Sequence, residues 1–445
     1  MKRKTLTLNI ILSSTILLIV GFLFTNLASA NFFPDPGPDL PRIYIRNDGS
    51  IEPAASPIKR AGEVYKLTGN VVLYTIEIQR DNTVLDGAGY AIQGNSSRIK
   101  GYDDGNNGLI IAGRKNVTVK NLNFEIGDTG IRISGSSNIS IFDNSFSNGI
   151  CTGIEVQDSM FIIIEANQFT NLRTDFHIPA VMLNGSKNTF RNNTLTGSTY
   201  GITVIGSSTL VSDNKIKSII PVMLENANSN TIMNNEITGP TPSLIFPNQT
   251  YTGNEGIALF VNCSNNIIIG NNITGFINQA LRIAFDGVNN TIYGNYFANN
   301  QFAIAIGGWS DVVPINNIFY GNTFAEDSCK IQIDNRDCNF WDNGTLGNYW
   351  SNYNGTDSNG DGIGDTPYTV NGYKWDTDVE GFVSFAANQD NYPLMAPFIT
   401  SQSTTTSQEP NPEKETFPAI PVTIASATAV AVVVSLMVYF KKRKR

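Results

Sequence analysis

The sequence is poor in the side chains that bind transition metals. Its 445 residues include one histidine and four cysteines, and no two cysteines form a Cys-x-x-Cys pair. A structural zinc site needs four Cys or His ligands at close spacing, so this kind of site is nearly excluded. The seven methionines are scattered as well, which leaves no cluster of soft ligands for copper.

Basic residues are scarce in the body of the chain. Of the 30 basic residues, three stand at positions 2–4 and five at 441–445, which leaves 22 against 38 acidic residues. A body with this excess of negative charge repels phosphate backbones. The sequence therefore predicts no nucleic-acid partner, and its 41% hydrophobic and 15% charged residues are typical of a folded chain.

The beginning of the chain predicts export. The basic residues at 2–4 precede an apolar stretch from Ile10 to Phe24 and the small residues at 28–30. This order is that of a secretory signal peptide, residues 1–30, with cleavage after Ala30. An uncleaved anchor is the alternative, but the apolar stretch is shorter than the roughly 20 residues that span a bilayer.

The end of the chain predicts a membrane anchor. Residues 417–440 are apolar and precede the basic tail 441–445, which indicates one C-terminal transmembrane helix with a cytoplasmic tail. Residues 396–416 are rich in Ser, Thr, Gln, Pro and Glu and are expected to form a flexible linker. The rest is then an extracellular ectodomain at the cell surface, and a glycoprotein if its Asn-x-Ser/Thr sequons are used. These sequons include Asn116, Asn138, Asn184, Asn272, Asn343 and Asn354.

A short unit recurs through the middle of the chain, in segments such as SNISIFDNSF, SNTIMNNEI and NNTIYGNYF. Eight aligned copies share one asparagine position, with separations of 21 to 27 residues and one of 36. Two places later each copy has a large apolar residue. The asparagines are Asn144, Asn167, Asn193, Asn214, Asn235, Asn271, Asn295 and Asn322. The apolar residues are Phe146, Phe169, Leu195, Ile216, Ile237, Ile273, Phe297 and Phe324.

These copies predict the coils of a parallel β-solenoid. Short alternating β-branched runs bounded by Gly, Asn, Asp and Ser are typical of strands, and the unit is too short for a helical repeat. Coils that stack at about 4.8 Å would place the apolar side chains in an internal column and the asparagines in a hydrogen-bonded ladder. The alternative, surface loops of a β-sandwich, does not account for eight copies in register.

The chain resembles archaeal surface proteins with NosD-type (PbH1) repeats. The resemblance rests on the repeated Asn-x-[Thr/Ile]-Ile-x-x-Asn-x-[Ile/Phe] coil, on LDGAGY at 85–90, and on the segments at 347–368 and 390–394. It implies an all-β, single-stranded right-handed parallel β-helix with terminal caps. That superfamily includes carbohydrate-binding proteins, polysaccharide lyases, hydrolases and copper-site maturation factors, so the resemblance is specific for the fold and not for an activity.

The expected ectodomain has three parts: an N-terminal cap at 31–69, the β-helix at 70–325, and a C-terminal cap at 326–395. Caps are expected because an open solenoid end exposes unpaired backbone and core side chains. Aromatic residues of the C-terminal cap are expected to cover the last coil, although they could instead stack on a sugar. They are Phe340, Trp341, Tyr349, Trp350 and Tyr353.

The C-terminal cap contains a segment with the spacing of a calcium loop. Oxygen-bearing side chains stand at positions 1, 3, 5 and 9, a glycine at position 6 permits the sharp turn, and position 7 can offer its carbonyl. Position 12 is Tyr368 rather than a bidentate Glu, so Asp376, Asp378 or Asp390 could complete the shell. The sequence predicts structural Ca²⁺ here, with an Asp/Gly turn satisfied by water as the alternative. The predicted ligands are Asp357, Asn359, Asp361, Ile363 and Asp365.

Three of the repeat units contain an insertion, and each insertion follows the apolar position of its unit. The insertions are residues 95–107, 170–179 and 238–253. A solenoid presents such insertions on one side, where loops could border a groove for an extended polysaccharide. Acidic and basic residues on these loops are the candidates for catalysis, with ordinary solvated loop residues as the alternative. The candidates are Asp103, Asp104, Arg173, Asp175 and His177.

The stacking of the coils also decides which cysteines can form a disulfide. Cys151 and Cys263 belong to coils about four spacings apart, roughly 19 Å, whereas a disulfide needs Cα atoms within about 7 Å. Cys329 and Cys338 are nine residues apart around a turn and exported, so a disulfide between them is predicted.

The sequence favours a membrane-anchored surface protein that binds glycans or has a structural role in the cell envelope, without turnover. No paired-carboxylate set of the polygalacturonase kind is present. A polysaccharide lyase or glycoside hydrolase acting in a groove is the first alternative. A NosD-like copper-binding maturation factor is the second, although one histidine and scattered cysteines argue against copper.

Overall fold

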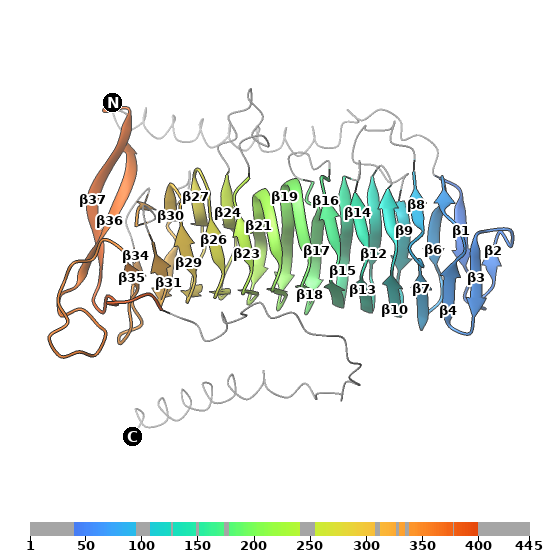
Figure 1. The fold of residues 1–445 in the computed structure, drawn as a ribbon, viewed down its shortest axis with the longest axis horizontal. Coiled ribbons are helices and arrows are strands. Elements are labelled where there is room, and N and C mark those ends of the chain that lie inside the picture. The colour runs from blue at the N-terminus through green and yellow to red at the C-terminus, as the bar shows by residue number, and fades with distance from the viewer. Residues whose placement is uncertain are drawn as a thin grey trace, which may run out of the picture. The chain divides into compact units, whose positions relative to one another are not determined.

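Every regular element that the structure describes is a β-strand, and the strands form one continuous stack (Figure 1). The stack is a parallel β-helix of the right-handed type with about ten turns, which confirms the fold predicted from the repeat. All described residues lie in the unit of residues 1–400. The computed structural model describes residues 40–94, 107–125, 128–147, 151–172, 178–240, 254–307, 312–325, 329–333, 338–376 and 378–398.

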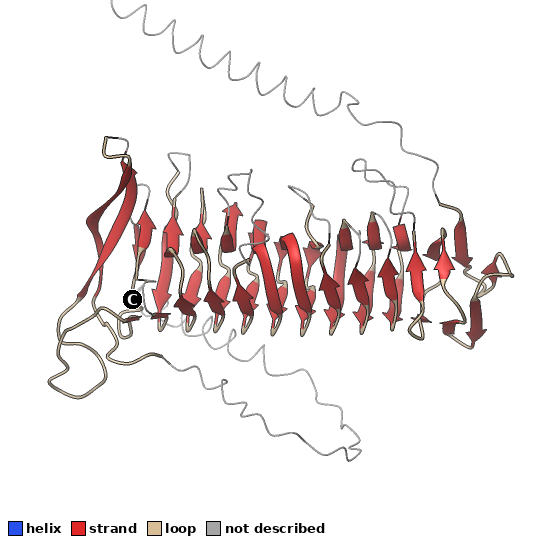
Figure 2. Cartoon of the chain, turned by 45° about the horizontal axis from the view of Figure 1, so that its top comes forward, coloured by secondary structure: helices blue, strands red, loops and turns tan. Residues whose placement is uncertain are grey.

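Each coil contributes up to three strands, so the rod has three faces, which we call A, B and C in chain order (Figure 2). Face A contains β1 (Arg42–Ile45), β6 (Thr75–Ile78), β9 (Asn107–Ala112), β12 (Thr129–Ser134), the first part of β15 (Thr152–Glu165), β17 (Val181–Ser186), the second parts of β19 (Thr194–Ser207) and β21 (Lys215–Asn228), β24 (Glu255–Val261), β27 (Gln279–Ile283), β30 (Phe302–Ile306) and β33 (Ile331–Ile333). Face B contains β4 (Val64–Leu67), β7 (Thr83–Asp86), β10 (Lys115–Lys120), β13 (Ser137–Phe142), the second part of β15, β18 (Thr189–Arg191), β20 (Leu210–Ser212), β22 (Thr231–Met233), β25 (Ile267–Ile269), β28 (Thr291–Tyr293), β31 (Ile315–Tyr320) and β34 (Cys338–Phe340). Face C contains β5 (Val71–Val72), β8 (Ala91–Gln93), β11 (Asn123–Glu125), β14 (Ser145–Ser147), β16 (Gln168–Thr170), the first parts of β19 and β21, β23 (Glu236–Thr238), β26 (Asn272–Thr274), β29 (Tyr296–Ala298), β32 (Thr323–Phe324) and β35 (Tyr349–Trp350).

The predicted apolar column lies inside the rod. The eight aligned Phe, Leu and Ile side chains are at most 1% exposed. Phe146 stacks between Phe124 and Phe169, with ring centroids 4.8 and 4.7 Å apart and planes within 4°. This separation equals the spacing of neighbouring strands, so identical side chains on successive coils stack face to face. Burying each such side chain contributes about 1.5–3 kcal/mol to folding.

The predicted asparagine ladder runs along the corner between faces B and C, and its members are at most 2% exposed. Asn235 shows the pattern. Its Oδ1 accepts hydrogen bonds from the backbone N (3.0 Å) and the Nδ2 (2.9 Å) of Asn214. Its Nδ2 donates to Oδ1 of Asn271 (2.9 Å) and to the carbonyls of Val211 and Met233 (2.9 and 3.0 Å). The amide thus satisfies a buried turn and ties each coil to the next.

A second asparagine ladder, which sequence analysis did not identify, runs along the corner between faces A and B. Nδ2 of Asn230 donates to Oδ1 of Asn266 at 3.1 Å, and the same bond recurs on the following coils. In four coils the asparagine of the second ladder stands five residues before the asparagine of the first ladder. This constant spacing in the sequence could have revealed the second ladder. The second ladder contains Asn230, Asn266, Asn290, Asn317 and Asn339.

The N-terminal end of the rod is closed by short antiparallel pairs. β1 pairs antiparallel with β2 (Ile51–Glu52), and β3 (Ile58–Ala61) pairs antiparallel with β4. β1 and β4 also pair in parallel with β6 and β7, so the segment expected as a cap already contributes strands to faces A and B.

The C-terminal end is closed by aromatic rings, as expected. Trp341 and Trp350 are 1% exposed and stack on Phe319 and Phe324, at 4.5 and 4.3 Å between ring centroids. Phe340, by contrast, is 54% exposed. Beyond them β36 (Tyr368–Asp376) and β37 (Gly381–Asp390) form an antiparallel hairpin, the orange pair in Figure 1, whose first strand pairs with β33.

Candidate functional site

The three insertions predicted to flank a groove all join face C to face A. They connect β8 to β9, β16 to β17 and β23 to β24, so they leave the helix at the same corner. The candidate site must be built from the described residues of the faces themselves, because the groove candidates lie outside the described residues. These candidates are Asp103, Asp104, Arg173, Asp175 and His177.

Face A carries ion pairs between adjacent coils. Nε and Nη2 of Arg132 both lie 3.0 Å from Oε2 of Glu155, and Nη1 of Arg282 lies 2.6 Å from Oε1 of Glu255. Both glutamates are buried, at 9% and 4% exposure. Each carboxylate is therefore committed to a charge-assisted hydrogen bond with a guanidinium.

The two buried carboxylates are too far apart to act together. The register of the strands puts four coil spacings between the coil of Glu155 and that of Glu255. At about 4.8 Å per coil the separation is about 19 Å. Two carboxyl groups that hydrolyse a glycosidic bond stand about 5–9.5 Å apart. Glu155 and Glu255 do not form such a pair.

The aromatic side chains on the outer surface of faces B and C include Tyr293, Tyr296, Tyr320 and Phe340, and we call these four the aromatic strip. Tyr293 and Tyr320 are register partners, and their rings stack with centroids 5.1 Å apart and planes within 2°. Burial raises the pKa of both hydroxyls above the ordinary value, so they stay neutral at physiological pH. Tyr296 is 41% exposed and Phe340 54%. The aromatic strip is thus an uncharged surface with accessible ring edges and faces.

The segment predicted to bind calcium is a compact exposed turn. Oδ1 of Asp357 accepts hydrogen bonds from the backbone N of Gly360 (2.7 Å) and Asp361 (3.2 Å). Oδ2 of Asp365 accepts from the N and Oγ of Ser358, and these bonds lower the pKa of that carboxyl. No three carboxylates of the described residues converge on one point. Calcium binding by Asp357, Asn359, Asp361, Ile363 and Asp365 stays a prediction.

Asp390 is buried and accepts hydrogen bonds at the end of the first ladder. Its Oδ2 accepts hydrogen bonds from N (2.7 Å) and Nδ2 (3.2 Å) of Asn348 and from Nε1 of Trp350 (2.9 Å). Its Oδ1 accepts from N of Tyr392 (3.1 Å). Asn348 is the ladder asparagine of the coil after Asn322, so Asp390 is the terminal acceptor of the first ladder. Burial raises its pKa to about 6.

The cysteines are thiols in the structure. Cys263 is buried, its Sγ donates to the carbonyls of Leu224 and Val261 at 3.3 Å, and burial raises its pKa to about 11. The register keeps it four coils from Cys151, which confirms that these two cannot pair. Cys329 and Cys338 carry no disulfide in the structure, so their pairing stays a prediction.

A copper site does not fit the donors that the structure describes. Cys263 holds its proton, and Sγ of Cys329 lies 3.3 Å from Oγ of Ser351, which is a hard donor. Within the described ranges no three His, Cys, Asp or Glu side chains are grouped to hold a metal ion. Copper prefers imidazole and thiolate or thioether ligands, and the chain has one histidine in all.

The predicted membrane anchor at 417–440 lies outside the described residues. Among the residues that are described, no helix is long and apolar enough to cross a membrane.

Comparison with known proteins identifies one family. The model of a family described as Periplasmic copper-binding protein (NosD) matches residues 88–254 and, in a second overlapping match, 152–313. Together the matches extend over 88–313, just over half of the chain. No curated protein matches the sequence.

Solved structures that are similar to the chain include a tailspike protein and an epimerase. The tailspike protein of E. coli bacteriophage HK620, in a mutant form with a hexasaccharide, is 16% identical over 59% of this chain and 48% of that chain, with a TM-score of 0.39. A complex of the same tailspike protein with a pentasaccharide is 16% identical over 61% of this chain and 53% of that chain, with a TM-score of 0.41. A mutant of the periplasmic alginate epimerase AlgG is 12% identical over 67% of this chain and 82% of that chain, with a TM-score of 0.47. The chain spans about half the length of the tailspike proteins that it matches.

Proposed function

The chain belongs to the NosD family, and from this premise we propose that it is a cell-surface β-helix protein that binds glycans, or supports them in the cell envelope, without cleaving them. Two buried ladders and a continuous apolar column tie each coil to its neighbours, so the rod is suited to hold a rigid outer surface. The family's description as periplasmic supports a site of action outside the cytoplasm.

The copper chemistry in the family's description does not carry over to this proposal. The described residues lack a cluster of soft ligands, and the buried Cys263 is a neutral thiol. We therefore derive no step through copper.

The aromatic strip is the observation that carries the proposal. Sugar rings have apolar faces that pack on aromatic side chains and hydroxyls that bond to polar groups, and tyrosine offers both kinds of contact. In the aromatic strip Tyr293 and Tyr320 lie on adjacent coils, so repeated contacts with an extended polymer follow the repeat of the protein. The surface is uncharged, which suits a polyhydroxyl ligand better than a polyanion.

The absence of turnover is supported by the state of the buried carboxylates. Glu155 and Glu255 are held by arginines and lie about 19 Å apart, whereas glycoside hydrolysis needs two carboxyl groups within about 9.5 Å. A face with this arrangement can position a ligand but does not supply an acid and a base at one bond.

We place the ectodomain outside the cell, held by the C-terminal apolar segment 417–440. The chain's signal-like beginning and basic end support this orientation. Protease added to intact cells should remove the ectodomain and leave a small membrane-bound fragment, whereas complete protection of the full chain would contradict the proposal.

Binding and cleavage can be tested on the same preparation. We expect the detergent-purified full chain to bind neutral members of a glycan array. We also expect no unsaturated or reducing ends to appear when it is incubated with polysaccharides in calcium. The double variant Tyr293→Ala/Tyr320→Ala should bind polymers more weakly than a control variant with Trp375→Ala, an exposed ring on the β36–β37 hairpin. New chain ends from any polymer would establish an enzyme and overturn the proposal.

A further inference from the structure

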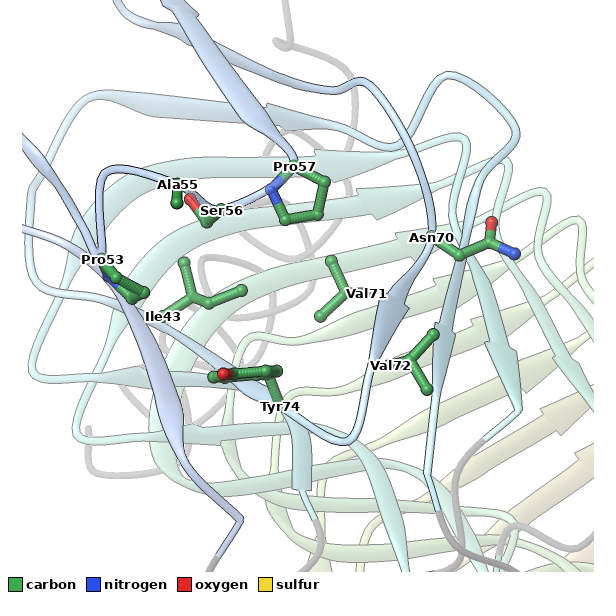
Figure 3. Close-up of a pocket in the computed structure, with 9 residues that line it drawn as sticks. All are labelled: Ile43, Pro53, Ala55, Ser56, Pro57, Asn70, Val71, Val72 and Tyr74. Carbon is green, nitrogen blue, oxygen red and sulfur yellow. The ribbon is translucent and has the colours of Figure 1, made fainter.

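The N-terminal cap contains a pocket with a volume of about 300 Å³ (Figure 3). It lies between the loop from Pro53 to Pro57, which follows β2, and the turn around β5. Figure 3 shows Ile43 and Val71 between Pro57 on one side and Tyr74 on the other. We call it the cap pocket. Its volume is at the lower end of the range for small-molecule sites, so it suits one compact ligand.

The walls of the cap pocket are fixed before any ligand arrives. Backbone N of Ser56 donates to the carbonyl of Pro53 at 3.0 Å, and N of Thr68 donates to the carbonyl of Pro57 at 2.9 Å. Two prolines further restrict this loop. Because the cavity is preformed, binding orders few additional groups.

The lining of the cap pocket is uncharged. None of its nine lining residues that the structure describes is acidic or basic. An ionic ligand would lose its water without gaining a counter-charge, which is unfavourable. The cap pocket therefore favours a neutral ligand.

Tyr74 is a polar side chain that the cap pocket presents to a ligand. Oγ of Ser56, by contrast, is buried with almost no accessible surface, so a ligand in the cavity does not reach it. Tyr74, 36% exposed, supplies an aromatic ring and a hydroxyl. The hydroxyl of Tyr74 can bond to hydroxyl groups on a ligand, which an aliphatic ligand lacks. A sugar ring combines those hydroxyls with an apolar face that fits Tyr74.

We infer that the cap pocket binds one neutral sugar ring, with Tyr74 packed against the ring. Ile43 and Val71, each 1% exposed, close the inner side, so the cavity accepts the end of a glycan rather than a continuous chain. This inference rests on the proposed function and names a site and a ligand class for it.

Ligand-observed NMR on the full chain in detergent tests the site, with the methyl glycosides of glucose, galactose, mannose and N-acetylglucosamine as probes. At least one probe is expected to bind. Tyr74→Ala should weaken binding about tenfold or more. Tyr90→Ala is the matched control, because this tyrosine is similarly exposed but lies outside both the cap pocket and the aromatic strip, and it should leave binding unchanged.

A second variant separates a lost contact from a disturbed fold. Val72 is 51% exposed at the pocket, so Val72→Trp should block the cavity without altering the core or the melting temperature. Binding that survives both Tyr74→Ala and Val72→Trp would overturn the cap pocket and leave the proposed function intact. Binding lost only in Tyr90→Ala would likewise overturn the cap pocket. Failure of all four probes would overturn the cap pocket, and the glycan array would then decide the proposed function separately. Methyl glucuronide that binds as well as the neutral probes would also overturn it.

Discussion

Asp390 should make the stability of the C-terminal cap depend on pH. Asp390 is 0% exposed and receives four N–H donors, three on Oδ2 and one on Oδ1. Replacing it by asparagine keeps the shape but removes the charge. The amide of Asp390→Asn also brings an NH₂ group against one set of donors, so some loss of stability at every pH is expected.

The size of the pH-dependent part follows from the pKa. Burial raises the pKa of Asp390 from 3.8 to about 6 in the folded protein. Folding therefore favours the protonated form, and the resulting stabilisation is complete below about pH 4 and is lost as the pH rises through about 6. A pKa shift of about two units changes the free energy of unfolding by about 3 kcal/mol between very low and very high pH. Between pH 4 and pH 7.5 the change is about 2 kcal/mol.

The assay compares the wild type with Asp390→Asn at the two pH values. The free energy of unfolding of the wild type, minus that of the variant, should be about 2 kcal/mol larger at pH 4 than at pH 7.5. The indole N–H resonance of Trp350, assigned by its loss in Trp350→Phe, should titrate with a midpoint near pH 6, because this N–H donates to the carboxylate. A free-energy difference independent of pH, or a midpoint below pH 4.5, would refute the reasoning.

Three further results are expected. Asn235→Ala should cost about 3–5 kcal/mol, because it leaves several buried ladder groups unpaired, while Asn272→Ala on the exposed side should change little in chemical denaturation. Asp361→Ala should lower the melting temperature more in calcium than in chelator, and equal losses in both would remove the calcium prediction. Mass spectrometry of the protein isolated from its native surface should find Cys329 and Cys338 joined, and two free thiols there would contradict the predicted disulfide.

The repeated part of the fold could be predicted because its physics is periodic. An asparagine that satisfies a buried turn is selected again on every coil, so Asn144 and Asn167 identify both the ladder and the core column two residues later. In four coils the second ladder stands in the same segments, five residues before the first. It was missed because the first position alone accounted for the repeat.

The site could be predicted less well, because its contacts are not periodic. Asp390 stands 42 residues after Asn348, and nothing in the local sequence shows that its carboxylate replaces the amide of a further coil. The cap pocket likewise depends on where the loop containing Ser56 meets Tyr74. The candidates Asp103 and His177 lie on insertions outside the described residues, so those assignments remain predictions.

The length of the rod separates the cap pocket from the end of the described chain. The described chain ends at residue 398, where Phe398 contacts the coil of Gly321 in the C-terminal third, whereas the cap pocket is at the opposite extremity. About ten turns lie between them, roughly 45 Å of stacked strands. A ligand in the cap pocket is therefore held about that far from residue 398 by a stack of hydrogen-bonded coils. Removing whole turns from the middle of the rod would shorten this distance by about 4.8 Å per turn and leave both ends unchanged.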